Sequence, residues 1–141
     1  MLDDTGAIYA KQRHETAARM TYFYYLAGAG LLGLGAIYAS IPALLVGFYF
    51  FANTVIGKAL NPYPAYWYAF FVLVHLLYGG ALMAYKEPWL LLAGVCFMAG
   101  AGLSLATWLG SPIAHRLYGH FDVALCVGII TGTLVHMLKP I

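Results

Sequence analysis

The chain has 141 residues, of which 63% are hydrophobic and only 9% are charged, whereas soluble domains average about 45–50% apolar and about 25% charged residues. Such a small number of charged residues could not solvate the surface of a water-soluble fold. The sequence therefore predicts an all-α integral membrane protein. The net charge is only +2, and the basic residues are scattered, which argues against a nucleic-acid partner. The first expected partner is the lipid bilayer.

The N-terminal segment, residues 1–19, is polar and carries charges of both signs. It is too long and too acidic for a signal peptide, which needs a short basic start followed by an apolar core. We therefore expect a retained cytoplasmic segment that precedes a helical membrane domain at 20–141. Lys11 and Glu15 are four residues apart, a spacing that supports a helix between Ala7 and Arg19.

The remainder of the chain is a series of apolar runs. A membrane-spanning helix needs about 20 mostly apolar residues, because the hydrocarbon layer is about 30 Å thick and each helical residue rises about 1.5 Å. Five runs meet this requirement: 21–39, 41–60, 65–85, 88–109 and 119–138. Pro42, Pro64 and Pro88 fall at or just before the expected helix starts, where a missing N–H does no harm. The sequence thus predicts a bundle of about five transmembrane helices.

The boundary between the first two runs is the least marked, because only residues 40–42 separate them. A tight turn there gives five spans, and four spans with one run lying flat or re-entering is the alternative.

With five spans, the N-terminal side holds five basic residues: Lys11, Arg13, Arg19, Lys58 and Arg116. The other side holds Lys86 and Lys139. This asymmetry predicts a cytoplasmic N-terminus in a cell inner or plasma membrane, or the equivalent side of an organelle inner membrane.

Small residues recur at four-residue steps in two of the runs. In lipid, such residues let helix backbones approach closely. The stripe in the fourth run is Gly102, Ala106 and Gly110, and the stripe in the fifth run is Ala124, Gly128 and Gly132. We expect these stripes to seal helices of the chain together. Docking of a partner chain, or room for a flat cofactor, are the alternatives.

Three histidines are candidates for a haem b site. His75 lies near the middle of the third run, and an ionisable side chain at that depth is a functional candidate. His120 and His136 flank the small stripe of the fifth run. However, His75 and His136 differ in expected depth by about 10 Å, whereas the two axial ligands of a haem lie nearly level. The alternative is a neutral His75 that is hydrogen-bonded to a neighbouring helix.

A second candidate site combines His115, His120 and Asp122 at the cytoplasmic end of the fifth run. Imidazole and carboxylate ligands suit zinc, copper or iron. Positions 120 and 122 point about 200° apart on a regular helix, so they could share a metal only across an irregular turn. Asp122 is the one acidic residue well inside an apolar run, and we expect it to pair with Arg116, His120, Arg19 or a partner chain.

No phosphate-binding loop, nucleophile triad or paired-cysteine motif occurs in the sequence. Few polar groups are available to build a transport path, whereas many aromatic and small residues could fit against other helices. We therefore expect a small non-catalytic subunit of a larger membrane complex, of the respiratory or another redox class, with other membrane subunits as partners. Two alternatives are an electron-transfer subunit that carries haem or metal, and a homo-oligomeric channel or carrier with Asp122 at its mouth.

Overall fold

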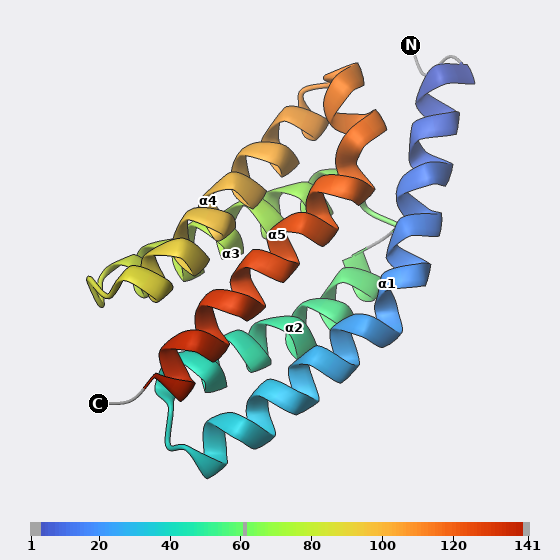
Figure 1. The fold of residues 1–141 in the computed structure, drawn as a ribbon. Helices are drawn as coiled ribbons and strands as arrows, with labels where there is room; N and C mark the ends of the chain where they lie inside the picture. Colours follow the sequence, from blue (N-terminus) through green and yellow to red (C-terminus); the bar gives the residue numbers. More distant parts are fainter. Residues whose placement is uncertain (1–3, 61, 140–141) are drawn as a thin grey trace.

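The computed structural model describes residues 4–60 and 62–139, apart from the side chains of residues 4–20, 64, 115 and 119. All regular structure in these residues is helical. Five helices follow one another in the chain (Figure 1): α1 Asp4–Ile37, α2 Ile41–Leu60, α3 Pro64–Met83, α4 Pro88–Trp108 and α5 Pro112–Leu138.

The helix starts carry the local signals that begin a helix. Proline occupies the first turn of α3, α4 and α5, where its missing N–H would have no intrahelical partner. Three side chains cap exposed backbone N–H groups. The Ser40 Oγ accepts from Ala43 N at 3.3 Å, and the Ser111 Oγ accepts from Ala114 N at 3.3 Å. The Glu87 carboxylate accepts from the N–H groups of the first turn of α4.

Four helical segments are long and apolar enough to cross a membrane: Ile41–Leu60, Ala65–Met83, Pro88–Trp108 and His120–Leu138. The apolar part of α1, Thr21–Ile37, is shorter. By length and composition, these helices are those of a multi-pass helical membrane protein. The expected boundary between residues 19 and 20 falls inside continuous helix α1, and α5 begins at Pro112, before its expected start at residue 119. Hydropathy marks the lipid boundary, whereas the backbone hydrogen-bond ladder continues past it.

The helices associate mainly as antiparallel neighbours. Figure 1 shows the apolar part of α1 beside α2, and α4 beside both α3 and α5. The first and last helices also touch, because α5 packs on α1 as well as on α2. The bundle is thereby closed by a contact between its two terminal helices.

Glycines set the closest approaches between helices. In the α1–α2 pair, a Cβ on Gly28 would lie 3.0 Å from the Gly47 carbonyl oxygen, and a Cβ on Gly47 would lie 3.0 Å from the Gly28 carbonyl oxygen. Gly79 and Gly94 face each other in the same way across the α3–α4 contact. A Cβ on Gly79 would lie 3.1 Å from the Gly94 carbonyl oxygen, and a Cβ on Gly94 would lie 3.0 Å from the Gly79 carbonyl oxygen. These reciprocal glycine pairs bring the backbones together, as small residues do in membrane helices.

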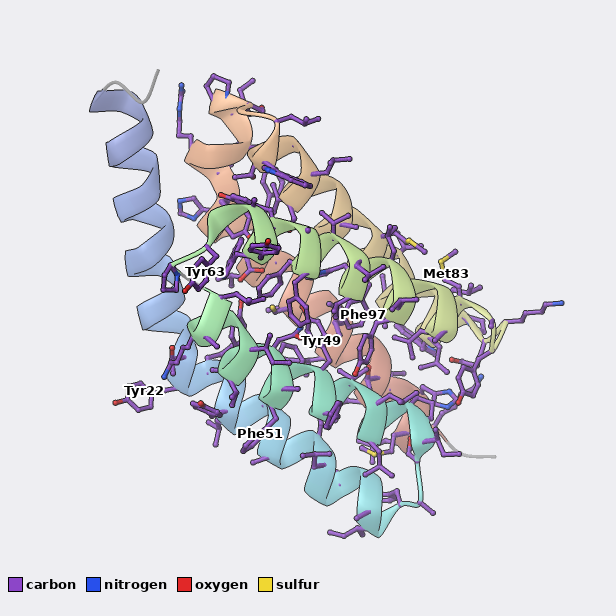
Figure 2. The ribbon with its side chains drawn as sticks, turned by 180° about the vertical axis from the view of Figure 1, so that it is seen from behind. Tyr22, Tyr49, Phe51, Tyr63, Met83 and Phe97 are labelled. Atoms are coloured by element: carbon purple, nitrogen blue, oxygen red, sulfur yellow. The ribbon has the colours of Figure 1, made fainter. Side chains whose placement is uncertain are left out.

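The core lies where α1, α2, α3, α4 and α5 meet. Figure 2 shows Tyr49 and Phe97 pointing into this centre, whereas Tyr22 points away from the bundle. The core side chains are mostly apolar and come from every helix: Leu31, Val46, Tyr49, Phe50, Leu82, Leu90, Ala93, Phe97, Cys126 and Ile129. The polar side chains that share this interior define the candidate site.

Candidate functional site

His75 and Tyr49 form a buried hydrogen-bonded pair between α3 and α2. Each side chain belongs to a residue that is only 6% exposed. The His75 Nδ1 lies 2.6 Å from the Phe71 carbonyl oxygen; because a carbonyl only accepts, Nδ1 carries the proton. In the neutral ring Nε2 is therefore an acceptor, and the Tyr49 hydroxyl, 2.8 Å away, donates to it. Both nitrogens of His75 are thus engaged within the chain.

This arrangement does not fit a haem ligated by His75. The Nε2 atom that would bind iron accepts the Tyr49 hydroxyl. Gly79, one turn after His75 on α3, faces the α4 backbone at Gly94. Gly100 leaves space that the imidazole itself fills, since a Cβ there would lie 2.6 Å from the His75 Cδ2. The space around His75 is occupied by α4.

The other two candidate haem ligands lie elsewhere. His120 is exposed near the start of the apolar part of α5. His136 lies in the last turn of α5, and its Nδ1 donates to the Glu87 Oε2 over 3.0 Å. The structure therefore does not bring His75, His120 and His136 together at one site.

Asp122 pairs with a tyrosine of the first helix. The Tyr24 hydroxyl donates to the Asp122 Oδ2 across the α1–α5 contact. The Cys126 Sγ, one turn further along α5, lies 4.0 Å from the same hydroxyl. From the sequence, the expected partners of Asp122 were Arg116, His120, Arg19 or a partner chain, and Tyr24 was not among them. No local spacing could have indicated a residue 98 positions away.

The predicted metal site is not assembled by the described side chains. Asp122 points inward to Tyr24 and His120 is exposed, whereas the side chain of His115 lies outside the described residues. Among the side chains that the structure describes, no group of three or more His, Cys, Asp or Glu residues could hold a metal ion.

The two predicted small-residue stripes have different surroundings. Gly128 and Gly132 face α4: a Cβ on Gly128 would lie 2.5 Å from the Cys96 Sγ, and a Cβ on Gly132 would lie 2.5 Å from the Trp89 carbonyl oxygen. Ala124 is exposed and Ala106 is half-buried. Gly102 has open space where its Cβ would be. Gly110 lies after the end of α4 with φ of +89°, a left-handed conformation that glycine adopts without strain.

The packing face of α4 within the chain is a different one. Its buried residues are Leu90, Ala93, Gly94, Phe97, Gly100, Ala101, Ser104 and Thr107. Small residues occur on more than one side of this helix, so a four-residue repeat alone could not select the buried side.

Sequence reasoning missed a polar contact at the opposite end of the bundle. Glu87, in the turn between α3 and α4, accepts from Trp89 N at 3.1 Å and Leu90 N at 3.0 Å. The same carboxylate binds His136 at 3.0 Å and lies 3.6 Å from the Lys139 Nζ. Partial desolvation raises the pKa of Glu87, but the hydrogen bonds and the nearby imidazole outweigh it and hold that pKa below its usual value of about 4.5.

This lowered pKa predicts a loss of stability in acid. A carboxyl whose pKa is lower in the folded state stabilises the fold fully above its unfolded pKa, and this contribution disappears as the pH falls through the folded pKa. We expect Glu87→Gln to remove that part of the acid destabilisation below about pH 4.5. The test is to measure the thermal unfolding temperature of the detergent-solubilised wild type and variant between about pH 7 and about pH 3. If the unfolding temperatures of both proteins fall in parallel with pH, Glu87 is not the source of the acid destabilisation.

Asn53 is a second polar residue that the sequence analysis did not single out. It is only 8% exposed, and its Nδ2 has no hydrogen-bond partner among the described residues. Asn53 follows Tyr49 by one helical turn on α2, so both residues lie on the same face. The centre of the bundle thus contains a polar patch of Tyr49, Asn53 and His75, separate from the Tyr24–Asp122 pair.

No family model, curated protein or solved structure matches the chain.

Proposed function

We propose that the chain is a small, non-catalytic helical subunit of a larger membrane complex of the respiratory or another membrane redox class. The observation that carries this proposal is the orientation of its glycines. Those facing inward, such as Gly47 and Gly94, lie against neighbouring backbones. Around Gly30, Gly33 and Gly102, apart from the backbone of their own helix and their chain neighbours, no atom lies within 4 Å of where a Cβ would be.

Outward glycines in a membrane helix favour contact with another helix. Lipid tails are as apolar as leucine, so burying apolar area drives little association between membrane helices. The association comes instead from the close approach of helix backbones at small residues. Gly30 and Gly33 lie on α1 beside the exposed Ala29, and Gly102 lies on α4. The proposal of a redox complex is supported by the interior of the bundle, where oxidisable tyrosines donate hydrogen bonds to His75 and Asp122.

A five-span topology is part of the proposal. The apolar part of α1, Thr21–Ile37, is about 26 Å long at 1.5 Å per residue, at the short end of the lengths that cross a bilayer. It lies alongside α2 (Figure 1). We expect reporter fusions to place the N-terminus in the cytoplasm and the C-terminus on the other side. Fusions that report both termini on one side would contradict five spans.

The subunit proposal is tested by co-purification from native membranes in mild detergent. Gly102→Leu and Gly33→Leu should leave the fold of the chain intact, because open space receives the added side chain. They should reduce the recovery of partner subunits, because the added volume separates the helices. Val127→Leu, at an exposed position on α5, is the matched control.

Two results would contradict the proposal. If the wild-type chain is recovered without any other membrane subunit, it is not part of a stable complex. If both glycine variants retain their partners as fully as Val127→Leu does, the outward glycines are not the contact surface.

A further inference from the structure

Two tyrosines of the interior donate to groups that can take up a proton. The Tyr49 hydroxyl donates to the His75 Nε2 at 2.8 Å, and the Tyr24 hydroxyl donates to the Asp122 Oδ2. A tyrosine loses an electron most readily when its phenolic proton leaves at the same time. Loss of the electron alone would create an unpaired positive charge in a low-dielectric interior, which is costly. A proton acceptor at hydrogen-bond distance removes that obstacle.

Aromatic rings connect the two pairs. The Phe50 ring lies between them, with its centroid 5.1 Å from that of Tyr49 and 5.7 Å from that of Tyr24. The Tyr49 ring also packs against the rings of Phe97 and Tyr78, with centroid distances of 4.7 Å and 5.2 Å. The rings therefore form an unbroken series of contacts from the centre of the bundle to α1, with an oxidisable phenol at each end.

We propose that Tyr49 and Tyr24 form a relay for oxidising equivalents, with His75 and Asp122 as their respective proton acceptors. A one-electron oxidant takes an electron from Tyr49. The phenolic O–H bond breaks, and the proton forms an N–H bond at the His75 Nε2. The products are a neutral tyrosyl radical and an imidazolium that still donates through Nδ1 to Phe71.

The second step passes the oxidising equivalent to α1. Tyr24 gives an electron to the Tyr49 radical, while its own proton moves to the Asp122 carboxylate. The proton on the His75 Nε2 returns to the Tyr49 oxygen. Tyr49 and His75 are thereby restored, and Tyr24 holds the radical beside a protonated Asp122. Such a relay draws stray oxidising equivalents out of the bundle centre and is not a step of enzyme turnover, so it is compatible with a non-catalytic subunit.

The test uses the purified full chain in detergent and photogenerated ruthenium(III) tris-bipyridine as the oxidant, with persulfate as the terminal electron acceptor. Samples frozen after the flash are examined by electron paramagnetic resonance. We expect a persistent tyrosyl radical in the wild type that Tyr49→Phe reduces severalfold, whereas Tyr24→Phe blocks only the second step and leaves the radical on Tyr49 with a changed spectrum. Tyr22→Phe is the control, because Tyr22 is 83% exposed and points away from the bundle (Figure 2); it should leave the signal unchanged.

A second variant keeps both tyrosines. Glutamine at position 75 can accept the Tyr49 hydrogen bond but cannot hold the proton. His75→Gln should therefore slow radical formation on the order of 100-fold, the usual contribution of a positioned proton acceptor. It should also change the high-field spectrum, which reports the hydrogen bond to the radical oxygen.

The outcomes separate the relay from ordinary core packing. Equal signal losses in Tyr49→Phe and Tyr22→Phe, or an unchanged rate and spectrum in His75→Gln, would overturn the relay. If Tyr49→Phe fails to fold, the His75→Gln measurements decide. The experiment requires no partner, so its failure leaves the subunit proposal standing, and a chain that co-purifies with nothing leaves the relay standing.

Discussion

Leucine in place of Gly132 is expected to push α5 away from α4 and to destabilise the bundle more than any other single substitution considered for this chain. A Cβ at Gly132 would lie 2.5 Å from the Trp89 carbonyl oxygen and 3.2 Å from the Ala93 N. Overpacking of a filled interior typically costs about 1–3 kcal/mol. Here the obstacle is backbone, which cannot rotate aside, so we expect the free energy of unfolding to fall by the upper part of that range.

The measurement is thermal or denaturant unfolding in detergent, together with the yield of folded protein. Gly102→Leu is the matched control, because it adds the same side chain in open space on α4. Gly128→Leu should fall between the two, since the atom in its way is the Cys96 Sγ, a side-chain atom. Near-wild-type stability for Gly132→Leu would show that α5 is displaced from α4 in the membrane.

Tyr24→Phe is expected to have the second-largest effect, because it deprives the Asp122 carboxylate of its donor. A buried acceptor left without a partner costs about 1–3 kcal/mol, and we expect the middle of that range because the site lies at the polar end of the α1–α5 contact. Asp122→Asn should be milder, since an amide oxygen still accepts from the Tyr24 hydroxyl. Unfolding free energies of the two single variants and the double variant should be non-additive, as is usual for residues in contact.

Asp122→Asn also distinguishes a structural carboxylate from one on a transport path. We expect complexes assembled with this variant to keep their activity per particle and to show only the modest loss of stability. Abolished turnover at normal assembly would instead assign Asp122 to a proton or cation path, and the chain would no longer be an accessory subunit.

The helical segments could be predicted from the sequence because lipid imposes a length and a composition on them. The run 41–60 coincides with α2, and the prolines mark the starts of α3 and α4. A helix between Ala7 and Arg19 was predicted, but its continuation into the run 21–39 as the single helix α1, and the early start of α5, were not, because the residues outside the lipid boundary are not apolar. A hydropathy threshold cannot detect a helix that continues into a polar region.

The site could be predicted only in part. A neutral His75 hydrogen-bonded to a neighbouring helix was considered, but nothing in the sequence identified Tyr49 as its partner. Spacing reports which residues share a helix face; it does not report which faces meet. For the same reason Tyr24 could not be identified as the partner of Asp122.

The contact between α1 and α5 has a consequence for synthesis of the chain. Membrane helices are delivered to the bilayer in chain order, so Tyr24 arrives with the first helix and Asp122 with the last. Until α5 is inserted, the Tyr24 hydroxyl has no Asp122 to receive its hydrogen bond, and the side of α4 that Gly132 covers remains open. A chain stalled after α4 therefore displays an unmet polar group and an uncovered helix face, the features by which quality-control proteases and insertion chaperones can tell an unfinished product from a finished one.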